Sequence, residues 1–340
     1  MRYIQNPPNP YHKYDAEFLG EPSPVKLEVF EETATRAIVT KNNSPDVGFK
    51  YSVNCYRGCQ HGCTYCFARP YHEFLGYGAG TDFETKIIAK VNAPTLLRNE
   101  LRKKSLRGEL MSFSFTTDPY LPLEANYELT GKCLEACRDF GNPVAIVTKS
   151  PLVTRDSDLL IEINKCSGAT VYFSIPFLTL EKSKLFEPYA PQPEVRFRAM
   201  KQLADAGISV GIAIAPIIPG YNESDIPALL QKARSCGATE AFMTILRLPT
   251  ESLQNYFVSR LTENAPTKVD KILNHIKRER GGKLNNNTFG ERMSGKTEQW
   301  KLAVKMFDLH YKRLGFGCER VFREKMSLPQ KTTLQPHLFD

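Results

Sequence analysis

The chain has 340 residues, 41% of them hydrophobic and 24% charged, and its formal net charge is +8. This is ordinary for a globular protein of one or two domains. No apolar run approaches the roughly 18 residues of a membrane-spanning helix. The segment 1–8 also lacks the apolar core of a secretory signal, so we expect no membrane segment and a cytoplasmic location. Nine cysteines, an odd number in a reducing compartment, argue against a disulfide framework.

Residues 1–48, rich in Pro, Asn and Asp, predict an extended lead-in rather than a domain. From residue 49 to residue 250, short apolar runs alternate with amphipathic segments. The predicted strands are 51–53, 110–115, 144–148, 170–175, 209–214 and 241–246, and the predicted helices between them are 93–103, 129–139, 157–164, 194–205 and 226–236. This alternation predicts an α/β fold with a parallel sheet. Six units are too few to close an eight-stranded barrel, so we expect a partial (β/α)6 barrel with functional residues at the strand ends.

After about residue 251 the strands stop. Two helices are predicted, at 268–280 and 297–314, within a C-terminal helical extension over 251–328, and a flexible tail is expected at 329–340. Between Lys268 and Lys325 there are 15 Lys and Arg against 7 Asp and Glu, which leaves 30 of each sign for the rest of the chain. A basic C-terminal third on a neutral body favours a polyanionic partner, nucleic acid first. A solvated helical surface explains the same charge.

Four cysteines fall within twelve residues directly after the first predicted strand. Cys59, Cys63 and Cys66 have the spacing C-x3-C-x2-C, and Cys55 precedes them. Glycines before Cys59 and Cys63 suit a loop wrapped around a metal cluster. Three thiolates can hold three irons of a [4Fe–4S] cluster and leave the fourth iron open for chemistry. At this iron we expect S-adenosylmethionine (SAM), whose reductive cleavage gives a radical that abstracts hydrogen from substrate.

Two other kinds of site fit the same cysteines. A zinc site needs a fourth ligand, which His61 or Cys55 could supply. An electron-transfer or structural iron–sulfur cluster also needs a fourth ligand, and Cys55 is the candidate. Tyr65, between the last two cysteines, favours the SAM-dependent interpretation because an aromatic ring there can pack against adenine.

The segment 54–70, which contains this cysteine motif, closely resembles a radical SAM family related to spore photoproduct lyase. The resemblance continues along nearly the whole chain, through Ser44-Pro45-Asp46, Asp82-Phe83-Glu84-Thr85-Lys86, Thr117-Asp118-Pro119-Tyr120, Thr148-Lys149-Ser150, Ala215-Pro216-Ile217-Ile218-Pro219-Gly220, Leu246-Arg247-Leu248-Pro249 and Arg280-Gly281-Gly282-Lys283. It implies the partial barrel of radical SAM enzymes, a [4Fe–4S] cluster, SAM and an external one-electron reductant.

The resemblance also assigns cofactor contacts. Thr116, Thr117 and Asp118 follow the second predicted strand, where related enzymes bind the amino group of SAM, although a plain turn before Pro119 would look the same. Lys149 and Ser174 end the third and fourth strands, where the lyase has a Lys and a Ser near the SAM carboxylate. A third candidate for this carboxylate is Arg196, which could equally be a salt-bridged surface residue.

Three departures bear on the reaction. Phe115 stands where the lyase has a hydrogen-donating cysteine, Cys55 where relatives usually have proline, and Tyr189 where they usually have arginine. The resemblance therefore supports radical generation, but not thymine-dimer repair by the same route. We expect hydrogen abstraction from a nucleic acid base, with DNA repair as one setting. A protein or peptide substrate is the alternative.

The chain ends with Gln335, Leu338 and Phe339 in a spacing that resembles the peptide by which bacterial repair proteins dock onto the sliding clamp. The Gln amide would fix orientation while Leu and Phe fill an apolar pocket. Matches this short also arise by chance.

Overall fold

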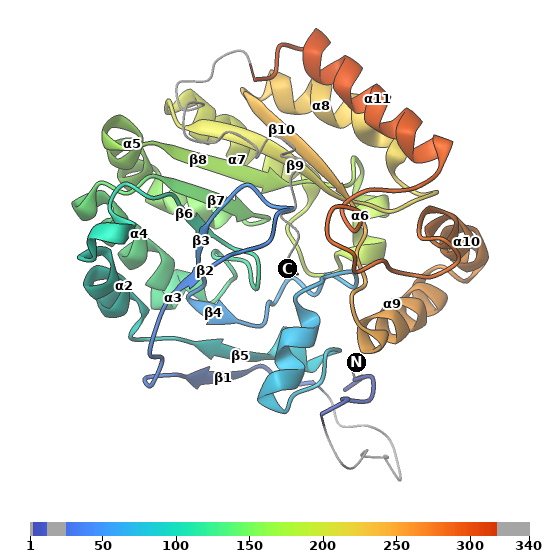
Figure 1. Cartoon of the computed structure of the whole chain (residues 1–340), viewed down its shortest axis with the longest axis horizontal. Helices are drawn as coiled ribbons and strands as arrows, with labels where there is room; N and C mark the ends of the chain where they lie inside the picture. Colours follow the sequence, from blue (N-terminus) through green and yellow to red (C-terminus); the bar gives the residue numbers. More distant parts are fainter. Residues whose placement is uncertain (1–2, 12–24, 318–340) are drawn as a thin grey trace, which may run out of the picture.

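The computed structural model describes residues 3–11 and 25–317 (Figure 1). The predicted tail at 329–340, with Gln335, Leu338 and Phe339, lies outside the described residues, and the clamp motif stays a prediction. In the described ranges, no helix is both long and apolar enough to cross a membrane.

The centre of the molecule is a seven-stranded open sheet. Its spatial order is β10 (Glu240–Ile245), β9 (Ser209–Ile217), β8 (Ala169–Ser174), β7 (Val144–Thr148), β6 (Met111–Phe113), β3 (Tyr51–Val53) and β2 (Val39–Lys41). The first six strands of this order run parallel, and β2 pairs antiparallel with β3 at the edge. Each of the six predicted strands overlaps one of these parallel strands. The predicted α/β fold with an open parallel sheet is thus confirmed.

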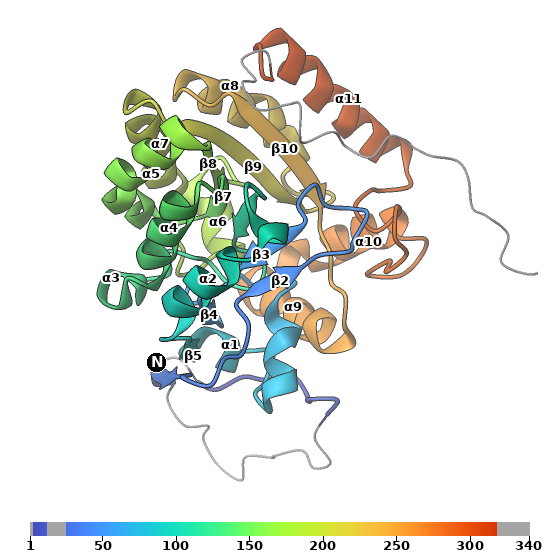
Figure 2. The same cartoon turned by 60° about the vertical axis from the view of Figure 1, so that its left-hand side comes forward.

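Helices from the connections between strands cover one side of this sheet (Figure 2). They are α2 (Ala93–Leu101), α4 (Leu129–Phe140), α5 (Ser157–Cys166), α7 (Pro193–Asp205) and α8 (Ile226–Ser235). Helix α7 shows why they pack there: Phe197, Met200 and Leu203 recur at helical spacing and are buried. Phe113 and Phe173, on the strands, are fully buried in the same core.

A second, three-stranded sheet has the order β1 (Glu28–Glu31), β5 (Lys86–Ala89) and β4 (Tyr56–Arg57). Strand β4 runs antiparallel to β5, with Tyr56 opposite Ala89. The pairing brings together the two ends of the intervening segment, which contains the cysteine motif, η1 (Arg69–Leu75) and α1 (Asp82–Thr85). The second sheet therefore closes the base of this segment. Its first part, residues 58–67 with the three spaced cysteines, is called the cysteine loop below.

The described part of the N-terminal segment packs along the segment between β4 and β5. The Gln5 amide donates to Thr81 Oγ1 at 2.9 Å, and the Asn9 side chain donates to the Tyr77 carbonyl at 3.0 Å. The backbones approach closely at Gly80, where an added Cβ would lie 2.0 Å from the Gln5 carbonyl oxygen. Glycine is therefore required at this position.

In the described residues after the last strand lie the α-helices α9 (Glu251–Asn264), α10 (Val269–Glu279) and α11 (Glu298–Arg313). Helices α10 and α11 match the two helices predicted there, and α11 lies against α8 (Figures 1 and 2). Helix α9 was not predicted, and it buries Leu253, Phe257 and Leu261. The remaining short helices are α3 (Glu124–Tyr127), α6 (Leu180–Phe186), η2 (Lys104–Leu106), η3 (Pro151–Asp156), η4 (Glu223–Asp225) and η5 (Pro266–Lys268).

Candidate active site

The cysteine loop lies next to the carboxyl ends of the parallel strands and is fixed there by backbone hydrogen bonds. The Cys59 amide donates to the Phe83 carbonyl at 2.8 Å, and the Thr64 amide donates to the Phe186 carbonyl at 2.9 Å. Cys59 packs with Phe83 in one apolar cluster, and Cys63 with Tyr65 in another. Cys66 packs against both clusters, so the fold brings the three predicted ligands together.

The donor set fits an iron–sulfur cluster. Burial raises the pKa of the Cys63 thiol to about 12 and also raises that of Cys59, so a bound metal would be needed to stabilise the thiolates. In the part of the chain that the structure describes, no three His, Cys, Asp or Glu side chains surround a single ion position. A [4Fe–4S] cluster does not need such a position, because each cysteine binds a different iron.

Cys55 lies apart from the triplet. Its Sγ is 3.5 Å from the Sγ of Cys133 on α4. Both residues belong to the main core formed by the strands and the helices that cover them, and not to the apolar clusters around the cysteine loop. Cys55 is 2% exposed. It is therefore placed as a core residue and not as a fourth ligand.

Replacing Cys55 with serine is expected to leave the iron and sulfide content of the reconstituted protein unchanged, because this thiol faces Cys133. Metal analysis and the visible absorption of the cluster check this against Cys63→Ser, which should lose most of the cluster. Equal loss in both variants would restore Cys55 as a ligand.

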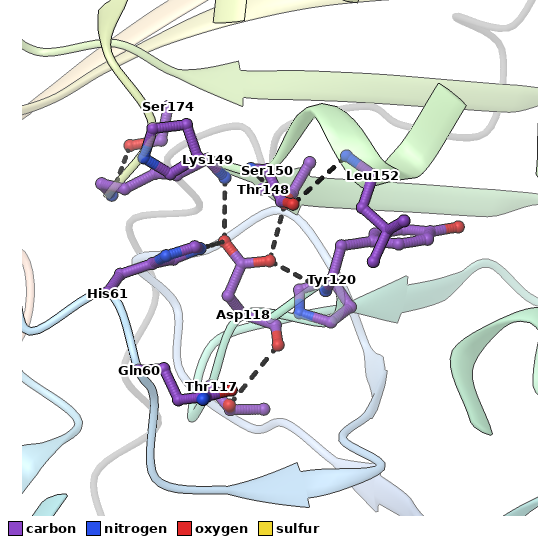
Figure 3. Close-up of polar contacts among 12 residues, drawn as sticks. Gln60, His61, Thr117, Asp118, Tyr120, Thr148, Lys149, Ser150, Leu152 and Ser174 are labelled. Atoms are coloured by element: carbon purple, nitrogen blue, oxygen red, sulfur yellow. Dashed lines mark hydrogen bonds and ion pairs between the residues drawn. The ribbon is translucent and has the colours of Figure 1, made fainter. Parts of the chain in front are cut away.

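Asp118 is the centre of a polar network at the end of β6 (Figure 3). Its Oδ1 accepts from Thr148 Oγ1 at 2.6 Å and from the Tyr120 amide at 2.9 Å. Its Oδ2 accepts from the Lys149 amide at 2.8 Å and lies 3.2 Å from His61 Nε2. Burial alone would raise the pKa of Asp118, but His61 and these donors lower it to about 2. The carboxylate thus ties the cysteine loop to the ends of β6 and β7.

The neighbouring threonines are also fixed. Thr117 Oγ1 donates to the Gly58 carbonyl at 2.5 Å, directly before Cys59, and the Thr116 amide donates to Asn54 Oδ1 at 3.2 Å. Ser114 and Phe115 have φ values of 130° and 89°, which side-chain-bearing residues rarely adopt. Strained backbone of this kind concentrates at functional sites. The Phe115 ring stacks on Phe49 with centroids 3.9 Å apart, and it occupies the position that the resemblance assigns to a cysteine in the lyase.

Lys149 and Ser174, predicted from separate strands, meet in the structure. Lys149 Nζ donates to Ser174 Oγ at 2.9 Å (Figure 3) and lies 5.8 Å from the centre of the Tyr65 ring. Burial alone would lower the pKa of Lys149, but negative charge on the neighbouring Cys63 sulfur and on Glu187 raises it. The group is therefore a partly buried cation beside the cysteine loop.

Glu187, which is not among the predicted site residues, joins three of them. Its carboxylate accepts from Tyr65 Oη, pairs with Arg196 at 2.5 Å and lies 3.7 Å from Lys149 Nζ. Arg196 is fully buried and also donates to the Ser174 carbonyl at 2.8 Å. Arg196 is thus neither on the surface nor free to bind a ligand. The available sequence signal for Glu187 was its position beside Pro188, just before the departure at Tyr189.

Arg69 is a second residue that sequence analysis missed. It is fully buried and donates to the Cys63 carbonyl at 2.9 Å, the Gly80 carbonyl at 2.7 Å and Glu84 Oε1 at 2.5 Å. Its guanidinium lies 4.4 Å from the centre of the Tyr256 ring on α9. It therefore links the cysteine loop, the segment 80–84 that precedes β5, and α9.

Asp118→Asn is expected to reduce the loss of stability in acid. The folded pKa of about 2 lies below the ordinary 3.8, so the ionised carboxylate stabilises the fold by about 2 kcal/mol at neutral pH. This stabilisation is present above the unfolded pKa and is lost as pH falls toward 2. Urea unfolding of the iron-free protein from about pH 3 to about pH 6 should show a smaller pH dependence in the variant. The same slope in both proteins would contradict the network.

Comparisons with known proteins agree with this geometry. Residues 53–233 match the family model described as the Radical SAM superfamily. The chain is 33% identical over 245 residues to an uncharacterized protein of Mycobacterium tuberculosis, covering 71% of this chain and 72% of the relative. It is 34% identical over 194 residues to an uncharacterized protein of Methanocaldococcus jannaschii, covering 57% and 69%. The fold resembles spore photoproduct lyase complexed with dinucleoside spore photoproduct, with a TM-score of 0.61, 17% identity and coverage of 85% and 80%.

Proposed function

Because this chain belongs to the radical SAM superfamily, whose enzymes use a [4Fe–4S] cluster, SAM and a reductant, we propose that it abstracts a hydrogen atom from a nucleic acid base. The observation that carries the proposal is the loop of Cys59, Cys63 and Cys66, set apart from Cys55 and placed beside the Lys149–Ser174 pair. Three ligands leave one iron free for SAM, whereas an electron carrier would use four. A cluster held there would supply, when reduced, the electron that cleaves SAM into methionine and a 5′-deoxyadenosyl radical.

The chain's own residues would hold SAM in place. Lys149 and Ser174 offer a partly buried cation and a hydroxyl to the carboxylate, as charge-assisted hydrogen bonds require. The strand end at Thr116 and Thr117 would receive the amino group. Asp118 already accepts from three donors, so its part is to keep that strand end in position.

Tyr65 would complete the cofactor site. Its hydroxyl is bound to Glu187, which fixes the ring close to the Lys149 ammonium. A ring fixed in this way can pack against the adenine without losing further side-chain entropy. Arg196 would act indirectly, since its guanidinium holds Glu187.

Two observations favour a nucleic acid base as the substrate. The fold resembles a lyase whose structure holds a dinucleoside, and the excess of positive charge lies in the C-terminal third. Phe115, stacked on Phe49, offers no hydrogen to a substrate radical in the way a thiol does. The reaction is therefore proposed to start as in the lyase and to end differently.

The experiment follows deuterium from substrate into 5′-deoxyadenosine. The reconstituted protein is reduced anaerobically with dithionite and SAM, together with single-stranded DNA or RNA deuterated in the bases. Mass spectrometry should show deuterium in the 5′-deoxyadenosine from one of them. The nucleic acid substrate is wrong if neither polymer speeds the formation of 5′-deoxyadenosine and neither transfers deuterium to it. Labelled peptides would then be tested next.

A further inference from the structure

Three motifs of the sequence lie outside the candidate active site, and the fold brings them together. They are the motifs that contain Asp46, Arg247 and Arg280. Arg247 follows β10, Arg280 ends α10, and Asp46 lies in the connection between β2 and β3. The segment after α10, which carries Arg292, runs beside that connection (Figures 1 and 2): Arg292 Nε donates to Asp46 Oδ2 at 2.5 Å. These segments form one surface next to the cysteine loop.

Two of the three arginines hold this surface together. Arg280 is 4% exposed and donates to the carbonyls of Leu246 at 2.6 Å and Ser294 at 2.9 Å. Arg292 donates through Nη2 to Ser44 Oγ at 2.6 Å, in addition to its pairing with Asp46. Both guanidinium groups are therefore engaged in fixing backbone segments.

Arg247 is different. Its Nε is buried without a hydrogen-bond partner, and its Nη1 lies 3.9 Å from the weak acceptor Met293 Sδ. Among the described residues it forms no ion pair. Burial lowers its pKa and the neighbouring Arg292 lowers it further, although Asp46 acts in the opposite direction. A partly buried cation next to another cation is costly unless an anion joins it.

Exposed aromatic rings stand beside these cations. The Arg247 guanidinium is 5.9 Å from the centre of the Phe67 ring, and Arg292 is 4.1 Å from that of Phe289. The two rings are 40% and 58% exposed. Phe67 directly follows Cys66, so this surface begins where the cysteine motif ends.

An unpaired guanidinium next to exposed rings is the combination that binds single-stranded nucleic acids, with the cation on a phosphate and bases stacked on the rings. A phosphopeptide would need the cations but would leave the rings without a role. The acidic groups nearby do not oppose this, because each faces a cation: Asp46 pairs with Arg292, Glu291 pairs with Lys296, and the buried Glu279 acts on the Arg280 guanidinium.

We infer that Arg247, with the rings of Phe67 and Phe289, binds a phosphate and the adjacent bases of a single-stranded nucleic acid and holds it against the cysteine loop. This inference rests on the proposed function and gives its substrate class and its binding residues. The arginine supplies affinity for the backbone, and the rings supply stacking that does not depend on base identity.

The test is fluorescence anisotropy with the reconstituted full chain and a dye-labelled single-stranded DNA or RNA of about 12 nucleotides. R247Q is expected to bind about tenfold more weakly than wild type, which corresponds to about 1.4 kcal/mol, and to lower the slope of log affinity against log salt by about 0.7. F67L should weaken binding without changing that slope. The matched control is R102Q, at the exposed C-terminal end of α2.

Cluster absorption and circular dichroism confirm that each variant is folded. The inference is overturned if wild type binds neither polymer, if R247Q binds like R102Q, or if a phosphopeptide competes as well as the oligonucleotide. Binding is measured without SAM, so the result is independent of the radical chemistry. Failure to form 5′-deoxyadenosine would instead overturn the proposed function while leaving the binding result in place.

Discussion

Replacing Glu187 with glutamine is expected to lower the free energy of unfolding by about 3 kcal/mol. The substitution keeps the shape of the side chain but leaves the Arg196 guanidinium without a charge partner in the interior, where both side chains are fully buried. Burial alone would raise the pKa of Glu187, yet Arg196 and Lys149 hold it below its ordinary value, so the carboxylate is ionised at neutral pH. Urea unfolding of the iron-free chain at pH 7 measures the loss.

The matched control is Glu162→Gln, because Glu162 pairs with Arg138 on the surface, where ion pairs contribute little. Glu187→Gln should also weaken SAM binding, since Lys149 and Tyr65 both depend on this carboxylate for their positions. If Glu187→Gln had the same free energy of unfolding as Glu162→Gln, Glu187 would not be the residue that holds Arg196, Lys149 and Tyr65 together.

Replacing Arg69 with methionine is expected to cost about 4 kcal/mol and to reduce the iron content after reconstitution. The methionine keeps the apolar stem, but the carbonyls of Cys63 and Gly80 lose a donor, and Glu84 loses its cation. Since the Cys63 carbonyl belongs to the cysteine loop itself, the loss of stability and the loss of cluster should occur together.

Arg138→Met provides the comparison, because Arg138 is exposed and pairs with Asp139 and Glu162 on the surface. It should leave both unfolding and iron content close to wild type. If Arg69→Met were destabilised but took up iron normally, the arginine would support α9 and not the loop.

The central sheet could be predicted from the sequence because buried parallel strands appear as short apolar runs between amphipathic helices. Helix α9 was missed although a signal was present: Leu253, Phe257 and Leu261 recur every four residues, and the Thr250 side chain accepts from the Leu253 amide. The pairing of strand β4 in the second sheet had no such signal. Strand β4 has two residues, and its partner β5 follows only after the whole cysteine loop.

The site divides in a similar way. The cysteine triplet and the pair of Lys149 and Ser174 could be placed from motif spacing and strand ends. The link through Glu187 could not, because its partners Tyr65, Lys149 and Arg196 come from three different segments, and side-chain contacts between such segments leave no periodic trace in a sequence. Arg196 shows the consequence: it was predicted to bind the SAM carboxylate or to form a surface salt bridge, whereas it is fully buried and paired with Glu187.

The most direct test is the formation of 5′-deoxyadenosine from SAM by the anaerobically reconstituted and reduced protein. Wild type and Cys55→Ser are expected to form it, and Cys63→Ala is expected to form none, because the cluster needs three ligands from the loop and one free iron. No product from wild type with an intact reduced cluster, whether or not DNA or RNA is added, would contradict radical SAM chemistry at this site.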